Sequence, residues 1–297
     1  MASGAKLLGT SPYRGFHIGW PGSGKTGALA SLANAGYKLR VLDFEGNFAP
    51  LVNFVDERVL ADPSRIDIVT LQDQLRNHDK YVEVVGIPDA FNRGLELLKE
   101  WKYKDDDGTE INLGRSADWG PDTVVVVDSA TSFGEAAKRR QIKMQSKTPI
   151  TMTDTVWGAA VADFNNALEI MKRMDKKYHL IINCHKQMLG PQNFIARGDS
   201  DEIKKEKLEA IKDGMIPTRI YPVGVSKPQA QVLHGMLPTM LEFEKVTKVG
   251  KECRIIRTVS GPEIDVKIPS NKLKTEYPIE TGLADIFSLL GYKAPGF

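Results

Sequence analysis

Residues 19–26 read GWPGSGKT and fit the pattern G-x-x-x-x-G-K-[ST] at every fixed position. Backbone N–H groups can converge on phosphate oxygens only where several positions are glycine, which adopts the backbone conformations that such a loop needs. Lys25 would add a positive charge at the terminal phosphates, and the Thr26 hydroxyl would help to hold Mg²⁺. The motif therefore predicts a binding loop for Mg²⁺ and a nucleoside triphosphate, here ATP. The expected nucleotide-binding residues are Gly19, Pro21, Gly22, Ser23, Gly24, Lys25 and Thr26.

Strand and helix signals on both sides of the loop agree with this interpretation. Residues 15–19 form a short apolar strand, residues 25–35 are rich in helix formers, and Gly36 is a natural helix end. A second strand is predicted at residues 39–44, which completes one strand–helix–strand unit. The helix would direct its positive N-terminus at the bound phosphates.

Further along the chain, strands and helices continue to alternate. The run TVVVVD at residues 123–128 is continuously β-branched, which is typical of a parallel strand buried on both faces. The pattern predicts an α/β fold with a doubly wound, mostly parallel sheet, an antiparallel C-terminal extension at about 238–297, and one domain over residues 1–297. Residues 188–235 read as irregular apart from one charged helix. Other strands are expected at 66–71, 178–184, 240–247 and 254–259, and helices at 89–102, 157–171, 202–212 and 283–290.

Two carboxylates are candidates for the chemistry around the phosphates. Asp128 ends the buried run, where it would coordinate Mg²⁺ beside Thr26, although it could instead cap the next turn. The next residue is Ser129 and not the glutamate that many motor ATPases have there, so the base that activates water must come from elsewhere. Glu45 follows the second strand, and the carboxyl ends of parallel strands line one crevice. We therefore predict Glu45 as the general base, with a solvated loop carboxylate as the alternative.

A phosphate loop, a strand that ends in Asp-x-Glu and an apolar strand that ends in aspartate together resemble the RecA-like ATPase core. The resemblance implies that Glu45 activates water. It also implies a polar sensor of the γ-phosphate at the end of a later core strand, where this chain has Asn183-Cys184-His185, and His185 fits that role best. The expected catalytic residues are Glu45, Lys25 and His185.

More narrowly, the chain is similar to small phage-encoded, core-only RecA-like proteins that act as single-strand annealing recombinases. The similarity rests on the 18 residues before the phosphate loop, the Asp-x-Glu element, the His-Lys pair at 185–186 and the segment RIIRTVSGPEIDVKIPS at 254–270. It implies an ATPase that acts on single-stranded DNA in phage-type recombination or replication. It further implies a homo-oligomer, with a single-strand-binding protein as another partner.

Two basic segments are candidate DNA contacts. Residues 136–148 read AAKRRQIKMQSKT, with five basic residues and no acidic one, and lie where the RecA-like family has its first DNA loop. A second segment follows His185 and includes Lys186 and the pair 204–205. These cations could neutralise phosphates, but they could also form a solvated basic helix face, since the formal net charge is only +2. The expected DNA-binding residues are Lys138, Arg139, Arg140, Lys143, Lys147 and Arg197.

The composition argues against several other classes of protein. Of the 297 residues, 41% are hydrophobic and 26% are charged, which is ordinary for a chain that buries a sizeable core. No apolar run approaches the roughly 18 residues of a membrane span, and the N-terminus shows no signal-peptide pattern. Cys184 and Cys253 form neither a disulfide framework nor a paired metal motif. We therefore expect a cytoplasmic protein (in the host cytoplasm if the chain is phage-encoded) without zinc and without a membrane partner.

Three alternatives remain open from the sequence. A hexameric motor, such as a helicase or a DNA-packaging ATPase, would share the fold and form a translocating ring. A small-molecule (nucleotide) kinase is suggested by the spelling PGSGK at residues 21–25, although the Asp-x-Glu element suits activation of water better than a phosphoryl acceptor. A nucleotide-binding switch or assembly subunit would have negligible turnover.

Overall fold

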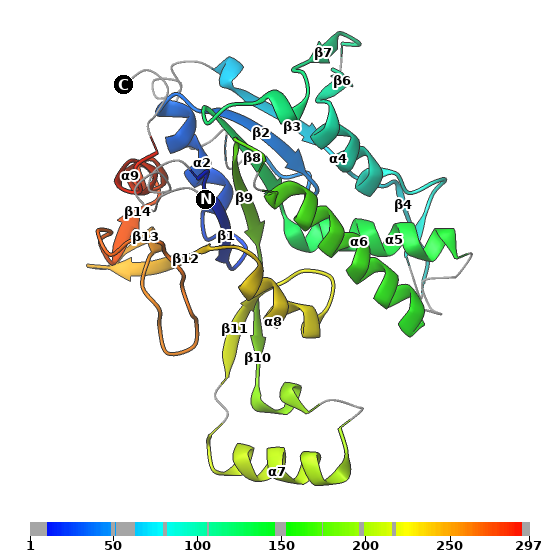
Figure 1. The fold of residues 1–297 in the computed structure, drawn as a ribbon, viewed down its shortest axis with the longest axis vertical. Helices are drawn as coiled ribbons and strands as arrows, with labels where there is room; N and C mark the ends of the chain where they lie inside the picture. The colour runs from blue at the N-terminus through cyan, green and yellow to red at the C-terminus, as the bar shows by residue number, and fades with distance from the viewer. Residues whose placement is uncertain are drawn as a thin grey trace.

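An eight-stranded sheet organises the chain in the computed structural model, which describes residues 11–48, 51, 63–79, 82–105, 107–145, 153–173, 175–195, 199–215 and 218–292. The strand order is β14-β13-β12-β1-β9-β8-β2-β3 (Figure 1). The strands from β12 to β3 are parallel, whereas β13 and β14 add an antiparallel edge. The predicted fold class, a mostly parallel α/β sheet with an antiparallel C-terminal extension, is confirmed. The strands are β1 (Arg14–Gly19), β2 (Lys38–Asp43), β3 (Ile66–Thr70), β8 (Thr123–Asp128), β9 (His179–Cys184), β12 (Thr239–Lys248), β13 (Lys251–Arg257) and β14 (Glu276–Pro278).

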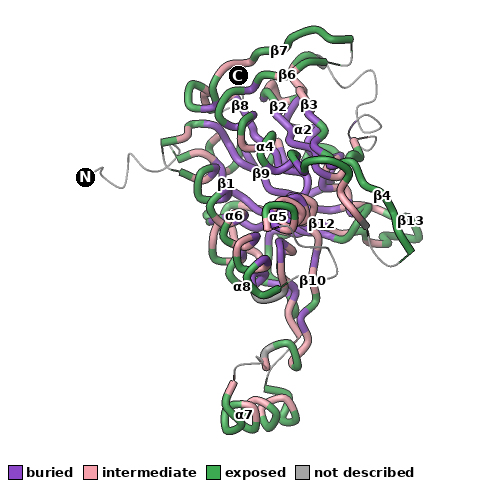
Figure 2. The backbone as a smooth tube through the Cα atoms, turned by 90° about the vertical axis from the view of Figure 1, so that its right-hand side faces the viewer, coloured by how far each residue is buried: buried purple, intermediate pink, exposed green. Residues whose placement is uncertain are grey.

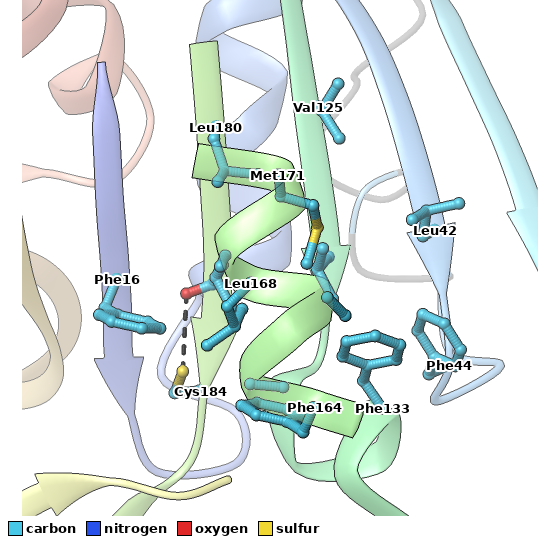
Figure 3. Close-up of a cluster of buried hydrophobic side chains, with 14 of the residues drawn as sticks. Phe16, Leu42, Phe44, Val125, Phe133, Phe164, Leu168, Met171, Leu180 and Cys184 are labelled. Carbon is cyan, nitrogen blue, oxygen red and sulfur yellow. Dashed lines mark hydrogen bonds between the residues drawn. The ribbon is translucent and has the colours of Figure 1, made fainter. Parts of the chain in front are cut away.

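Helices cover both faces of this sheet, which explains the continuous valine run. Val125 and Val127 point into a cluster with α4, α5 and α6 on one face, part of which Figure 3 shows. Val124 and Val126 point into the opposite cluster with α2 and α9. All four valines are fully buried, as β-branched residues on both faces of a parallel strand should be. The helices are α2 (Lys25–Asn34), α4 (Ala90–Lys99), α5 (Ala130–Met144), α6 (Asp154–Lys172) and α9 (Gly282–Leu289).

Two short hairpins lie outside the eight-stranded sheet. β6 (Lys102–Lys104) pairs with β7 (Glu110–Asn112), and Gly108 has a φ of 85° in the turn. A second hairpin joins β4 (Leu75–Asn77) to β5 (Val82–Val84). None of the helices that the structure describes is long and apolar enough to cross a membrane.

A projecting arm corrects the prediction that residues 188–235 are irregular. β10 (Lys186–Leu189) pairs antiparallel with β11 (Arg219–Pro222), and α7 (Asp201–Lys212) lies at the far end. Figures 1 and 2 show the arm leaving the body of the molecule, and α7 has no buried residue.

The arm could not be predicted because its strands have only four residues each, too few to show a hydrophobic period. The described prolines of this region mark boundaries of elements. Pro222 ends β11, and Pro228 lies in the first turn of α8 (Lys227–Met236), where its missing N–H costs no hydrogen bond. The charged helix predicted at 202–212 is present as α7.

Candidate functional site

The loop between β1 and α2 has the backbone geometry that an anion site requires. Gly22 and Gly24 have φ values of 76° and 97°, a region that residues with a Cβ rarely adopt. At Gly24, a Cβ would also lie 2.7 Å from Ile279 Cδ1. Gly24 is the N-cap of α2, so no side chain caps the first N–H groups of that helix. These N–H groups and the helix dipole favour a bound anion at this point.

Buried polar groups in the loop fit a phosphate ligand. Ser23 Oγ is buried and has no hydrogen-bond partner among the described residues. Lys25 Nζ donates to two loop carbonyls, that of Gly19 at 2.9 Å and that of the next residue at 3.2 Å. Burial lowers the pKa of Lys25, and the nearby Asp128 carboxylate opposes that shift. A phosphate would satisfy the Ser23 hydroxyl and balance the Lys25 charge.

Two other predicted loop residues have different surroundings. A Cβ at Gly19 would lie 2.6 Å from the carbonyl oxygen of Phe243 on the neighbouring strand β12, so strand packing alone requires glycine there. Pro21 is exposed in the turn. Contact between these two residues and a nucleotide stays a prediction.

Thr26 and Asp128, the predicted Mg²⁺ ligands, lie side by side. Thr26 Oγ1 donates to Asp128 Oδ2 at 2.6 Å, which joins the first turn of α2 to the end of β8. Burial raises the pKa of Asp128 to about 6, while the Thr26 hydroxyl opposes the shift. Burial outweighs the hydrogen bonds and the Lys25 charge that oppose it, and a carboxylate in this situation favours a further cation next to it. The two oxygen donors therefore fit a Mg²⁺ ion, which prefers hard oxygen ligands.

The turn after β2 carries Glu45 to the same edge of the sheet. Asp43 pairs in register with Asp128 of the adjacent strand β8. Asp43 Oδ1 accepts hydrogen bonds from the backbone N–H groups of Glu45 at 3.0 Å and Gly46 at 2.7 Å, and so holds the turn. Asp43, the first acid of the Asp-x-Glu element, thus holds the backbone of the turn. Glu45, the second acid, directs its carboxylate toward His185 and Ser129.

Two side chains hold the Glu45 carboxylate. His185 Nε2 lies 2.8 Å from Glu45 Oε1, and the Ser129 hydroxyl donates to the same oxygen. Both hydrogen bonds end at Oε1, and neither involves the other carboxylate oxygen, Oε2. The bond with His185 lowers the pKa of Glu45, an effect that burial opposes and that Ser129 reinforces. Glu45 is therefore an ionised acceptor at neutral pH.

His185 reaches this site from the end of β9, next to the base of the arm. Asn183, two residues earlier, pairs in register with Asp128, while Cys184 points into the hydrophobic core. The contact between His185 and Glu45 brings the predicted sensor to the predicted base. Its role as a γ-phosphate sensor stays a prediction.

The basic run at 136–148 forms no loop in its described part, because α5 extends to Met144. Three of its cations also pair with carboxylates outside the run, one of them on the same helix and two on other segments of the chain. These contacts join Lys138 to Glu135, with its Nζ 4.8 Å from the centre of the Trp157 ring, Arg139 to Asp73 at 3.9 Å, and Arg140 to Asp163 at 2.5 Å.

The other expected DNA contacts divide into three cases. Lys143 is exposed on the last turn of α5. Lys147 and Arg197 lie outside the described residues. Lys186 is buried: its Nζ lies 2.5 Å from Glu242 and 3.6 Å from Glu244, so it is not available to a DNA backbone.

The buried pair Lys186–Glu242 is expected to contribute strongly to stability. Burial raises the pKa of Glu242, and Lys186 opposes the shift. Lys186→Met would leave the Glu242 carboxylate uncompensated, which should lower the free energy of unfolding by about 3–5 kcal/mol in urea denaturation. Lys248→Met is the matched control, because its pair with Glu276 is exposed and should contribute less than about 1 kcal/mol. Similar losses in both variants would contradict the interpretation.

Sequence reasoning missed two members of the site, the hydroxyl of Ser129 and the turn-holding role of Asp43. Serine after a buried strand is also an ordinary N-cap, and Ser129 indeed caps α5. Its contact with Glu45 joins residues 84 positions apart, so no local pattern could reveal it. For Asp43, an available signal was its position two residues before Glu45, since aspartate side chains often accept hydrogen bonds from the following backbone.

Comparison with known proteins returns distant similarities of fold. No protein-family model and no curated protein matches the chain. The flagellar accessory protein FlaH from Methanocaldococcus jannaschii aligns with a TM-score of 0.37 and 8% identity over 91% of this chain and 84% of FlaH. The KaiC-like protein PH0186 from Pyrococcus horikoshii OT3 aligns with a TM-score of 0.41 and 10% identity over 90% of this chain and 85% of its own. Functional conclusions therefore rest on the site itself.

Proposed function

We propose that this protein is a RecA-like P-loop ATPase, which binds Mg-ATP on residues 19–26 and hydrolyses it with Glu45 as the general base. One observation carries the proposal: Lys25 and Thr26 of α2, Asp128 of β8 and Glu45 after β2 meet at one edge of the sheet. A cation for the terminal phosphates, oxygen ligands for Mg²⁺ and an ionised carboxylate are the groups that hydrolysis of a phosphoanhydride needs.

Each of these residues has a defined task in this mechanism. Lys25 exchanges its loop carbonyl partners for phosphate oxygens. Thr26 and Asp128 hold Mg²⁺, which when bound neutralises charge on the phosphates. Glu45 accepts a proton from the attacking water, which can reach it from an adjoining cavity of about 600 Å³ lined in part by Phe44 and Gln72.

Release of inorganic phosphate from ATP tests this proposal. With Mg²⁺ and no added acceptor, the protein should release phosphate, and removal of Mg²⁺ with EDTA should stop the release. A nucleotide kinase would consume ATP only when an acceptor is supplied. A nucleotide-binding switch would bind ATP and release nothing. Either of these last two results would overturn the proposal.

We also propose that the ATPase acts on single-stranded DNA, in phage-type recombination or replication, and assembles as a homo-oligomer. The proposal draws on the resemblance to annealing recombinases and on Lys143, which is exposed and makes no ion pair with the described residues. Lys138, Arg139 and Arg140 already form ion pairs with carboxylates. The proposed DNA contact therefore involves fewer residues of α5 than the basic run alone suggests. ATPase rate and light scattering, with and without single-stranded DNA, test both parts of this proposal.

Lys143→Ala should flatten the salt dependence of DNA binding. On single strands each neutralised phosphate contributes a slope of roughly −0.7 in log K against log salt, so the loss of one contact should change the slope by about 0.7. Arg140→Ala is the control, because its guanidinium already pairs with Asp163. Fluorescence anisotropy of a labelled oligonucleotide across a salt series measures both slopes. Equal slopes for the parent and Lys143→Ala would exclude α5 from the DNA contact.

A further inference from the structure

Ser129 is fully buried and connects two parts of the site. Its hydroxyl contacts Glu45 Oε1, and its oxygen accepts a hydrogen bond from the backbone N–H of Ser132 at 3.4 Å, as the N-cap of α5. An ionised carboxylate can only accept hydrogen bonds, and a backbone N–H can only donate. The Ser129 proton therefore has one place to go, which is the Glu45 carboxylate.

The two residues are held in a fixed relation by the packing around them. Phe44, which precedes Glu45, packs against Phe133 of α5 with ring centres 4.9 Å apart, and Phe133 in turn packs against Phe164 at 5.4 Å (Figure 3). The Phe44 N–H also donates to the Asp128 carbonyl at 2.7 Å. The backbone on both sides of the Ser129–Glu45 contact is thus anchored in the core, so the contact can fix the direction of a side chain.

The N-terminus of α5 also favours a carboxylate at this point. The first turn of this 15-residue helix contains no acidic residue. Its positive end therefore lacks the negative side chain that commonly compensates it. Glu45, which contacts the N-cap residue, brings that negative charge from another element. Packing and hydrogen bonds that hold a base in one rotamer reduce the conformational entropy that it must lose to reach the geometry for proton transfer.

We propose that Ser129 is a positioning residue for the hydrolysis of ATP: its hydroxyl fixes the Glu45 carboxylate in the direction from which it takes a proton from water. The inference rests on the proposed function of Glu45. It assigns Ser129 a role in turnover that is separate from its role as a helix cap, and none in nucleotide binding. Ser129 is the residue that follows the metal-binding aspartate, so this chain uses the position to orient a base that another strand supplies.

The test compares Ser129→Ala with Ser226→Ala. Ser226 caps α8 with the same 3.4 Å bond to a backbone N–H and has no contact with Glu45, so its replacement controls for loss of a helix cap. In Ser129→Ala we expect kcat for ATP hydrolysis to fall by about 10-fold or more, with the KM for ATP within about twofold of the parent. Ser226→Ala should retain the parental kcat. Equal kcat values for the two variants would overturn the proposal.

A double mutant separates this role from an effect on the neighbouring Asp128. In the Glu45→Gln background the base is absent, so Ser129→Ala should cause little further loss in single-turnover hydrolysis. The same fold-loss in both backgrounds would mean that Ser129 acts elsewhere, and the proposal would fail. Parental hydrolysis by Glu45→Gln would instead refute the proposed base itself. A slow Glu45→Gln together with an active Ser129→Ala would refute only the positioning role.

Discussion

Lys25→Ala is expected to weaken ATP binding by about 2–5 kcal/mol, which is roughly 30-fold to several thousand-fold. Lys25 Nζ is held at the loop by the carbonyl of Gly19, and its side chain is buried. Removal of the Lys25 charge would leave Mg²⁺ as the remaining cation of the proposed site for the terminal phosphates, and charge interactions are strong in a site that excludes much of the solvent. Titration with ATP and Mg²⁺ in a calorimeter measures the loss directly.

Lys38→Ala is the matched control for this variant. Lys38 begins β2 at the amino end of the sheet, far along the strand from the Glu45 turn, and pairs with Asp122 at 2.7 Å. Its replacement should leave ATP affinity at the parental value. If Lys25→Ala also binds ATP with parental affinity, the loop at 19–26 is not the nucleotide site, and the proposed function fails with it.

The elements around the phosphate loop were predictable because their signals are local. Each valine of the run at 123–128 reports burial on one face of the sheet, and the glycines at 22 and 24 report backbone conformations that other residues avoid. The Asp-x-Glu pattern begins at the last residue of β2, and the carboxyl ends of parallel strands line one crevice, which here also contains the phosphate loop. For these features, neighbouring residues carry all the necessary physical information.

The order of strands and the arm could not be predicted in the same way. β9 lies between β1 and β8 although it follows both in sequence, because strand order depends on how helices pack across the sheet. In the arm, β10 and β11 pair across about 30 residues, and neither strand is long enough to show a period. Their pairing is a contact between distant segments.

The charge state of α5 shows why a basic run is a weak guide to DNA binding. Residues 136–148 contain no acid, yet Asp73 and Asp163 reach this helix from other elements. These two ion pairs of Arg139 and Arg140 are tertiary contacts between segments distant in sequence, so the sequence of the run could not reveal them. The contact of Ser129 with Glu45 was hidden for the same reason.

Glu45→Gln is expected to reduce ATP hydrolysis on the order of 10²-fold or more, with near-parental ATP binding. The amide keeps the shape of the side chain and an oxygen that can accept from Ser129, but it cannot take a proton from water. Because the hydrogen bond with His185 lowers the pKa of Glu45, the parental carboxylate is ionised throughout the neutral range, and the loss should not depend on pH there. Single-turnover hydrolysis and ATP titration measure the two properties separately.

Two further carboxylates test whether this effect belongs to Glu45 alone. Glu135 lines the cavity next to Glu45, but its carboxylate forms an ion pair with Lys138. Glu135→Gln should therefore hydrolyse ATP at close to the parental rate. Asp43→Asn should lose less than Glu45→Gln, because the asparagine oxygen can still accept the two backbone N–H bonds that hold the turn. A base at either position would reverse this ranking. If all three variants hydrolyse ATP at the parental rate, water is activated by a group outside this crevice, and the convergence of Lys25, Thr26 and Asp128 would then support binding of ATP without hydrolysis by Glu45.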